Sequence, residues 1–120
     1  MLKNGKKVFV VAVRYNPQLG DYLTNGEIAT VVAVNKNTFR AKMPDWDGSM
    51  KTVTYCISRN GRHVRKEADR SVYGSMSHFA FDDRAQALDF LKIKRLSYSG
   101  IKSREDTCDK YAALVESGMA

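Results

Sequence analysis

The first 66 residues of the chain consist mostly of short β-prone segments separated by turn-forming residues. Apolar side chains alternate with polar ones in segments such as TFRAKM, which is typical of half-buried strands. Asn60-Gly61 lies between two such segments and is a strong signal for a tight hairpin. The predicted strands are Lys7–Tyr15, Glu27–Asn35, Thr38–Met43, Met50–Arg59 and Arg62–Lys66. Consecutive hairpins of this kind favour an antiparallel sheet.

The pattern becomes helical in the last third of the chain. Ser75–Phe81 is a candidate sixth strand. Asp82 is then placed to cap the N-terminus of a helix that ends near Leu96, and Asp83 suits the positive end of the helix dipole.

A second helix is predicted over Arg104–Ser117, where Ser103 and Asp106 resemble a capping box. Its apolar stripe has helical spacing and consists of Cys108, Tyr111, Ala112 and Val115. Because the strands come first and the helices last, the sequence predicts an α+β fold. We expect one domain over residues 1–120, with an antiparallel β-barrel of about five strands at 5–66 and two C-terminal α-helices at 82–117.

Positive charge is concentrated in the strand-rich part of the chain. The formal net charge is +7, from 20 Lys+Arg and 13 Asp+Glu. Residues 1–70 hold 13 of the basic and 6 of the acidic residues, a difference of +7, whereas residues 71–120 hold 7 of each. A one-sided positive field attracts polyanions. The charge therefore favours nucleic acid, DNA or RNA, as the partner; a basic surface that serves only solubility is the alternative.

The two cysteines, Cys56 and Cys108, belong to no CxxC motif or Cys/His cluster. Two buried thiols in a reducing cytoplasm are the simplest interpretation, and a zinc site is not expected. The sequence contains no apolar stretch long enough to span a membrane. We therefore expect a cytoplasmic protein without a metal or cofactor; the pattern leaves its oligomeric state open, with a dimer through the Cys108–Val115 stripe as one option.

The hairpin around Lys36-Asn37 has a predicted register. If these residues form the turn, with Asn37 at positive φ, the two strands place alternate side chains on opposite faces. The apolar face expected in the core includes Val32, Val34, Phe39 and Ala41. Arg40 and Lys42 fall on the other face, where their stems can lie over small apolar side chains with the charged ends in water.

The hairpin at Asn60-Gly61 places Arg59 and Arg62 opposite each other in the predicted register. Two like charges in this position repel, and an anion between them would reverse the effect. Arginine also suits forked contacts to phosphate, although a solvated hairpin tip is the other interpretation. The predicted nucleic-acid-binding residues are Arg40, Lys42, Arg59, Arg62, His63, Arg65 and Lys66. Contacts of this type hold a phosphate backbone without reading bases.

Trp46 lies between two carboxylates in the segment PDWDG. The carboxylates would repel a phosphate chain, and an exposed tryptophan is a natural hot spot for a protein partner. The alternative is that Trp46 folds back over the end of the barrel. DWDG lacks the further ligands of a calcium loop.

Three segments, GKKVFVV, NGEIATVVAV and TFRAKM, resemble an SH3-like small β-barrel of the KOW/Tudor-like type. The resemblance covers residues 5–66 and implies binding of nucleic acids or of protein peptides, without choosing between them. In its general style the chain is also similar to small accessory proteins of bacteriophages. Ribonuclease toxins of the MazF type use a related barrel, but this chain has neither Arg nor Pro in the matching segment, Asn25–Ala29.

Catalysis has few candidate groups in this sequence. His63 and His78 are the only histidines, and no nucleophile is tied to either of them by spacing; Cys56 shares a face with His63 only in the proposed register. We therefore expect a non-enzymatic nucleic-acid-binding module of low sequence specificity. The alternative is a protein-interaction module, in the style of a phage accessory factor that binds or inhibits a host protein, acting through Trp46 and the C-terminal helices.

Overall fold

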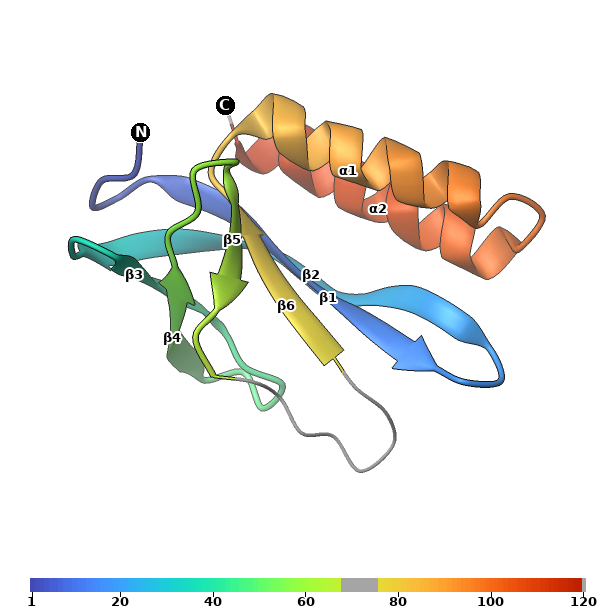
Figure 1. The fold of residues 1–120 in the computed structure, drawn as a ribbon, viewed down its shortest axis with the longest axis horizontal. Helices are drawn as coiled ribbons and strands as arrows, with labels where there is room; N and C mark the ends of the chain where they lie inside the picture. Colours follow the sequence, from blue (N-terminus) through green and yellow to red (C-terminus); the bar gives the residue numbers. More distant parts are fainter. Residues whose placement is uncertain (68–75, 120) are drawn as a thin grey trace.

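Six antiparallel strands close into a barrel in the computed structural model, which describes residues 1–67 and 76–119 (Figure 1). The strands are β1 (Lys7–Asn16), β2 (Gly20–Val34), β3 (Thr38–Pro44), β4 (Met50–Cys56), β5 (Arg62–Arg65) and β6 (Met76–Phe81). Each strand pairs with the next one in sequence, and β6 returns to pair with β1. Helices α1 (Arg84–Ser97) and α2 (Lys102–Gly118) follow and lie side by side. The predicted α+β fold, a barrel followed by two helices, is confirmed.

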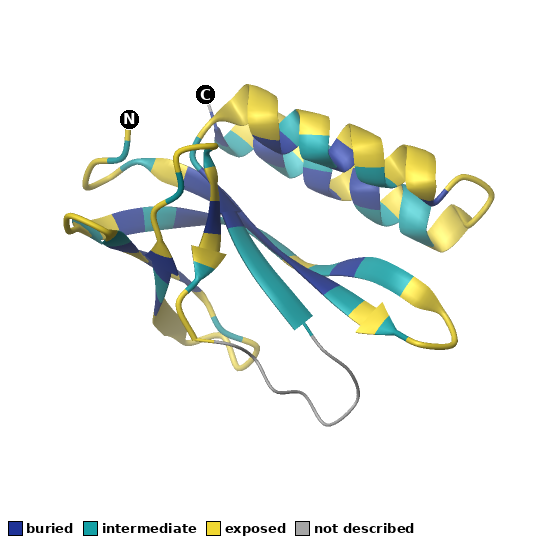
Figure 2. Ribbon diagram, viewed as in Figure 1, coloured by how far each residue is buried: buried dark blue, intermediate teal, exposed yellow. Residues whose placement is uncertain are grey.

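The apolar run VFVVAV belongs to β1, which is buried on both faces (Figure 2). Successive side chains of a strand point to opposite faces. Val8 and Val10 therefore point into the barrel, whereas Phe9, Val11 and Val13 point toward the helices. This double burial explains why β1 is continuously apolar rather than alternating.

Two hydrophobic clusters lie on either side of β1. The barrel interior consists of Val8, Val10, Ala29, Val31, Phe39, Ala41, Met43, Val53, Tyr55 and Ala80. The layer between the barrel and the helices consists of Phe9, Val11, Val13, Leu23, Phe81, Ala87, Leu91, Tyr98, Cys108, Tyr111, Val115 and Met119. The helices therefore cover one side of the barrel, and the sheet that faces away from them remains open to solvent.

Two glycines allow α2 to approach β2 closely. A Cβ atom on Gly26 would lie 2.6 Å from the Tyr111 ring, and one on Gly118 would lie 2.6 Å from Ile28 Cγ1. Both distances are too short for real side chains, so larger residues at either position would push the helix away from the strand. The predicted stripe of α2 is confirmed, since Cys108, Tyr111 and Val115 are buried.

The β2–β3 hairpin confirms the predicted register only near its turn. Val34 pairs with Phe39, and Asn35 N–H donates to the Thr38 carbonyl at 2.8 Å. A bulge at Val32 then shifts the pairing, so that Val31 rather than Val32 opposes Ala41. Val32, expected in the core, is exposed as a result. Val34 keeps its predicted partner but is also exposed, at the end of β2. Asn37 does not adopt positive φ; within the described ranges Asn25 is the non-glycine residue that does, at 57°.

Several predicted element ends were wrong. β2 begins at Gly20, well before the expected start at Glu27, because it pairs with β1 along the whole β1–β2 hairpin. Asp83, not Asp82, caps α1, and its carboxylate accepts from Gln86 N–H. α2 begins at Lys102 after Ile101, without a side-chain cap, so the expected capping box at Ser103 does not form.

The candidate sixth strand is confirmed over Met76–Phe81. Its predicted first residue, Ser75, lies outside the described residues. Among the described helices, neither is long and apolar enough to cross a membrane.

Candidate nucleic-acid interface

Basic and hydroxyl side chains share the outward face of β2, β3 and β4. Register pairs link Lys7 with Thr30, Thr30 with Lys42 and Lys42 with Thr52. A second row links Arg40 with Thr54, whose carbonyl accepts from Lys66 N–H. Directly paired residues in an antiparallel sheet point to the same face. We call this surface the outer basic face: Lys7, Thr30, Arg40, Lys42, Thr52, Thr54 and Lys66.

The cations of the outer basic face have no carboxylate partner within the described part of the chain. Arg40, Lys42 and Lys66 take part in none of the ion pairs there, and Lys7 Nζ donates to the Thr30 hydroxyl at 2.7 Å.

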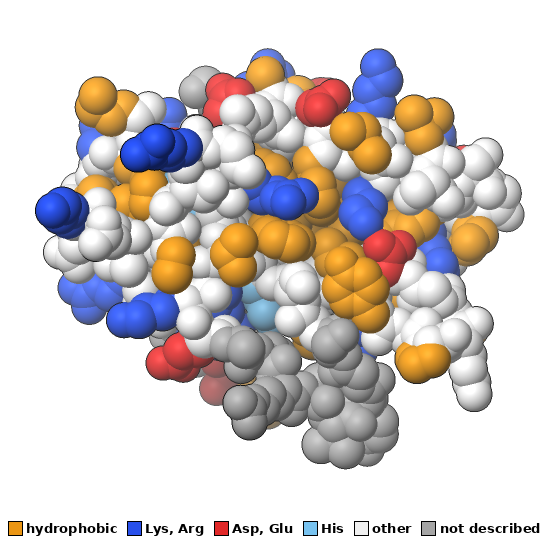
Figure 3. All heavy atoms as spheres, in the orientation of Figure 1, with side chains coloured by type: hydrophobic (Ala, Val, Ile, Leu, Met, Phe, Trp, Pro, Cys, Tyr) orange, Lys and Arg blue, Asp and Glu red, His pale blue; other side chains and the backbone are white. Residues whose placement is uncertain are grey.

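Three cations on the helices, Lys94, Arg95 and Lys102, differ because each has an acidic neighbour. Lys94 Nζ lies 2.7 Å from Asp21 Oδ2, and Arg95 Nε lies 2.7 Å from Asp109 Oδ1. Asp109 raises the pKa of Arg95 further above its ordinary value, mainly through their hydrogen bond. Lys and Arg side chains are visible on the barrel in Figure 3, on the left, over β3 and β4.

The predicted set of seven basic residues does not form one surface. Arg40, Lys42 and Lys66 lie on the outer basic face, but Arg65 pairs with buried Tyr55 and turns toward the end of the barrel. Lys7 and the three threonines were missed by sequence reasoning. The alternation MKTVTYC was the available signal, since it places Thr52 and Thr54 on the face opposite Val53.

The predicted pairing of Arg59 with Arg62 was wrong. β4 ends at Cys56, which pairs with Val64, one position out of the predicted register. Ser58 and Gly61 close a wider turn, and Asn60 holds it by accepting from Arg62 N–H at 3.0 Å. Arg62 lies over the Phe79 ring, 5.0 Å from its centroid, and Arg59 is exposed in the turn.

His63 is a core residue rather than a phosphate contact, because its exposed fraction is only 2%. Its Nδ1 accepts from Ser58 N–H at 2.9 Å, and its Nε2 lies 3.2 Å from an Asp82 carboxylate oxygen. Accepting at Nδ1 assigns the proton to Nε2. Cys56 is exposed, and its strand partner is Val64, so the histidine and the cysteine point to opposite faces of the sheet. The shared face considered from the sequence does not exist.

The two thiols also occupy different environments. Cys108 is buried against the helices as expected, and burial raises its pKa. Cys56, expected to be buried, is instead exposed on the same side of the sheet as Arg40 and Thr54, because it pairs with Thr38 at the end of β3. In the described ranges, no three His, Cys, Asp or Glu side chains come together as a metal site.

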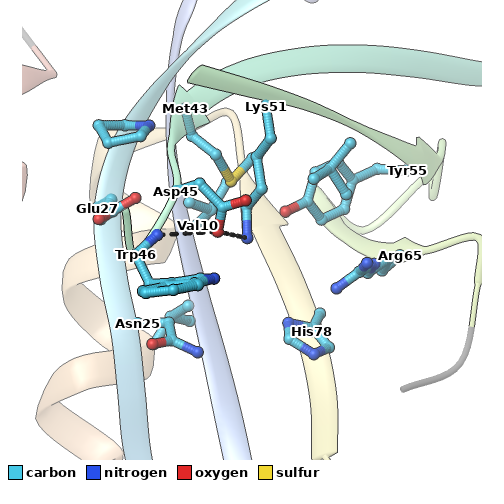
Figure 4. A pocket seen from close by; sticks show the side chains of 13 residues that line it. Val10, Asn25, Glu27, Met43, Asp45, Trp46, Lys51, Tyr55, Arg65 and His78 are labelled. Carbon is cyan, nitrogen blue, oxygen red and sulfur yellow. Dashed lines mark hydrogen bonds and ion pairs between the residues drawn. The ribbon is translucent and has the colours of Figure 1, made fainter. Parts of the chain in front are cut away.

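A pocket opens at the end of the barrel beside the outer basic face (Figure 4). Its volume is about 230 Å³. Asn25, Glu27, Asp45 and Trp46 lie along one wall, and Tyr55, Arg65 and His78 lie along the other, with Lys51 between them. We call this cavity the barrel-mouth pocket. Its residues come from six strands and one loop, and so the sequence alone did not bring them together.

Trp46 is held at the rim of this pocket by its own loop. Its backbone N–H donates to Asp45 Oδ1 at 2.8 Å, and Asp45 N–H donates to the Ser49 carbonyl at 2.6 Å. The indole itself is 94% exposed. Trp46 is therefore exposed at the rim, as in the first alternative considered from the sequence, and is not folded back over the barrel end.

Burial raises the pKa of Glu27 above its ordinary value of 4.5, partly offset by Lys51. The folded state therefore disfavours the carboxylate, and this cost is present at neutral pH and disappears as the pH falls through the folded-state pKa. We expect Glu27→Gln to be more stable than the wild type at pH 7 and equal to it near pH 4.5. Urea denaturation at both pH values measures this difference; a stability gain that persists unchanged at the lower pH would contradict the prediction.

A separate apolar groove lies between α1 and β5. It is lined by Asn60, Arg62, Phe81, Ala85, Gln86, Asp89, Phe90 and Ile93. Ile93 and Leu96 on α1 are 59% and 68% exposed, and hydrophobic side chains gather on this face in Figure 3. The β3–β4 loop with Trp46 lies at the other end of the molecule (Figure 1). Trp46 and the helices therefore do not form one continuous surface.

The fold was compared with known proteins in three ways. Nothing matches this chain among protein-family models, curated proteins or solved structures. The architecture is accordingly described by its own geometry: a small closed barrel of six antiparallel strands, followed by two helices.

Proposed function

We propose that this chain is a non-enzymatic nucleic-acid-binding module of low sequence specificity that holds a phosphate backbone on the outer basic face. One observation carries the proposal: the exposed cations Arg40, Lys42 and Lys66 share a face and lack carboxylate partners within the described residues. Unpaired cations keep their full attraction for phosphate, because no ion pair within the protein has to be broken first.

The spacing of these groups suits a repeating polyanion. Arg40 and Lys42 are two residues apart on β3, which corresponds to about 6.6–6.8 Å along a strand. Successive phosphates of one DNA strand rise by about 3.4 Å along the helix axis, so the two side chains can contact different phosphates. Thr52 and Thr54 add hydroxyl donors between them. Contacts of this kind with the nucleic-acid backbone supply affinity but do not distinguish one base from another.

A binding role, rather than catalysis, is further supported by the placement of the reactive side chains. His63 is buried with Nδ1 occupied by Ser58 N–H, and Cys56 lies on the opposite face of the sheet. The resemblance to KOW/Tudor-like barrels agrees with binding of nucleic acid, although it also agrees with binding of peptides.

The proposal is tested by fluorescence-anisotropy titration against labelled double-stranded DNA, single-stranded DNA and RNA. We expect binding at about 50 mM salt that weakens steeply at about 200 mM, because released counterions oppose binding as salt rises. The location of the bound nucleic acid is tested by measuring the alkylation rate of the exposed thiol of Cys56. Saturating nucleic acid should slow this reaction, while the buried thiol of Cys108 stays unreactive. Absence of binding at the lower salt would refute the proposal.

Protein binding is a second candidate, favoured by the exposed Ile93 and Leu96 beside the α1 groove. This surface is separate from the outer basic face, so Leu96→Lys would weaken a protein complex and leave nucleic-acid affinity unchanged. A Trp46 substitution would affect a protein partner only if that partner also reaches the barrel end.

A further inference from the structure

We infer that the barrel-mouth pocket receives one unstacked base of a single-stranded nucleic acid whose phosphates lie on the outer basic face. The inference rests on the proposed function and adds to it a preference for single strands. Four observations support it: the continuity of the two surfaces, the exposed indole, the polarity of the pocket walls and the pocket's size.

The barrel-mouth pocket adjoins the outer basic face. A shallow groove on that face is lined by Thr52, Val53, Thr54, Arg65, Lys66 and Glu67. Val53 and Arg65 line both this groove and the barrel-mouth pocket. Arg65 therefore stands at the junction, where it can contact a phosphate while the attached base turns into the pocket.

Trp46 provides a stacking platform at the rim. It is the only tryptophan in the chain and almost fully exposed. The loop hydrogen bonds of Asp45 fix its backbone before any ligand binds, which reduces the entropy lost on binding. Proteins that bind single strands commonly stack bases on exposed aromatic rings, and any base can use such a ring because every base has a π-face.

The two walls of the pocket differ in charge. Glu27 and Asp45 lie on the side of Trp46, whereas Arg65 lies opposite (Figure 4). The carboxylates repel phosphate, so the backbone must stay on the Arg65 side. Because Asp45 is paired with Lys51 at 3.5 Å, Glu27 is the acceptor available to a ligand. The Tyr55 hydroxyl keeps its proton, since burial raises its pKa to about 12, and it can donate to a base oxygen.

These groups match the edge of an unpaired base. Glu27 can accept from the amino group of an unpaired base, as carboxylates accept from cytosine N4 in the major groove. In a duplex that edge is already paired and the ring is stacked, so a base-paired nucleotide cannot enter. A cavity of about 230 Å³ has room for a single base. The expected ligand is thus a single strand with a base that carries an amino group, such as cytosine.

The experiment uses the fluorescence of Trp46 in the full chain. Oligo-dC should quench the indole emission, and a duplex of equal length should leave it unchanged even when anisotropy shows that the duplex is bound. Trp46→Ala should weaken oligo-dC binding by about 5- to 100-fold, the range for losing one stacked base. Trp46→Phe should retain most of the affinity, because a phenyl ring still stacks.

A matched control is the exposed aromatic residue Tyr15, which lies near the tip of the β1–β2 hairpin, outside the pocket. Tyr15→Ala should bind oligo-dC like the wild type. Glu27→Gln should reduce the preference for oligo-dC over oligo-dT, which carries no amino group.

The outcomes separate this inference from the proposed function. If oligonucleotides bind with normal salt dependence but Trp46→Ala binds oligo-dC like the wild type, the inference is overturned and the proposed function stands. If no oligonucleotide binds, the proposed function itself fails. If deoxycytidine monophosphate alone quenches Trp46 while no oligonucleotide binds, the pocket is a free-nucleotide site and both proposals are overturned.

Discussion

Replacing both Arg40 and Lys42 with alanine should lower nucleic-acid affinity by ~10-fold or more at low salt, with little dependence on sequence. Each side chain is exposed and free of ion pairs within the described residues. Each lost phosphate contact should reduce the slope of log affinity against log salt by about 0.7–0.9. Anisotropy titrations of wild type and double variant over a salt series measure both quantities.

The matched control removes two exposed cations from the helices. Lys92 on α1 and Lys110 on α2 are also exposed, so Lys92→Ala with Lys110→Ala makes the same change in net charge at a different place. We expect this variant to keep nearly all of the affinity. Equal losses in the two double variants would mean that only net charge attracts the ligand and would contradict the outer basic face as the binding surface.

Phe39→Ala should destabilise the fold by about 3–5 kcal/mol, the usual cost of removing a buried phenyl ring. Phe39 is 0% exposed, and its ring lies 5.4 Å from that of Tyr55 and 5.1 Å from that of His63. The alanine variant leaves a cavity between three strands that the closed barrel cannot collapse to fill. Because domains of this kind have total stabilities of about 5–15 kcal/mol, urea denaturation should show a greatly lowered midpoint.

Two further variants test whether the lost volume of the buried ring causes this destabilisation. Phe39→Leu keeps most of the volume and should cost less than about 1.5 kcal/mol. Phe79→Ala removes the same side chain from a half-buried position beside Arg62 and should cost clearly less than Phe39→Ala. A Phe39→Ala variant as stable as Phe39→Leu would show that the barrel interior is not packed around this ring.

Local sequence signals predicted the elements of this fold better than their pairing. The position of the β2–β3 turn and the stripe of α2 follow from spacings of two to four residues, and both were found, although Asn37 lacks the predicted positive φ. The bulge at Val32 was not predictable, because it arises where β2 has to bend between two partners. The register at β4–β5 failed for a related reason: Asn60 and His63 hold a wider turn through side-chain bonds to the backbone that the Asn-Gly signal does not contain.

The candidate site was predicted only in part. Alternation along β3 was enough to place Arg40 and Lys42 on one exposed face. It could not show which face of β5 points inward, and so that His63 enters the core, because this depends on how β5 pairs with β4 and β6. The barrel-mouth pocket combines Glu27, Trp46 and His78, which only closure of the barrel brings together.

The pairing of β1 with β6 determines when the barrel can close during folding. β1 forms a local hairpin with β2, but its second edge has no partner until Met76–Phe81 has been synthesised. During translation, the highly apolar strand β1 therefore has one unpaired edge, and this condition favours aggregation. Contacts between such distant segments also slow folding. β1 contributes side chains to both hydrophobic clusters, and it is thus also the strand whose unpaired edge most needs protection from aggregation in the nascent chain.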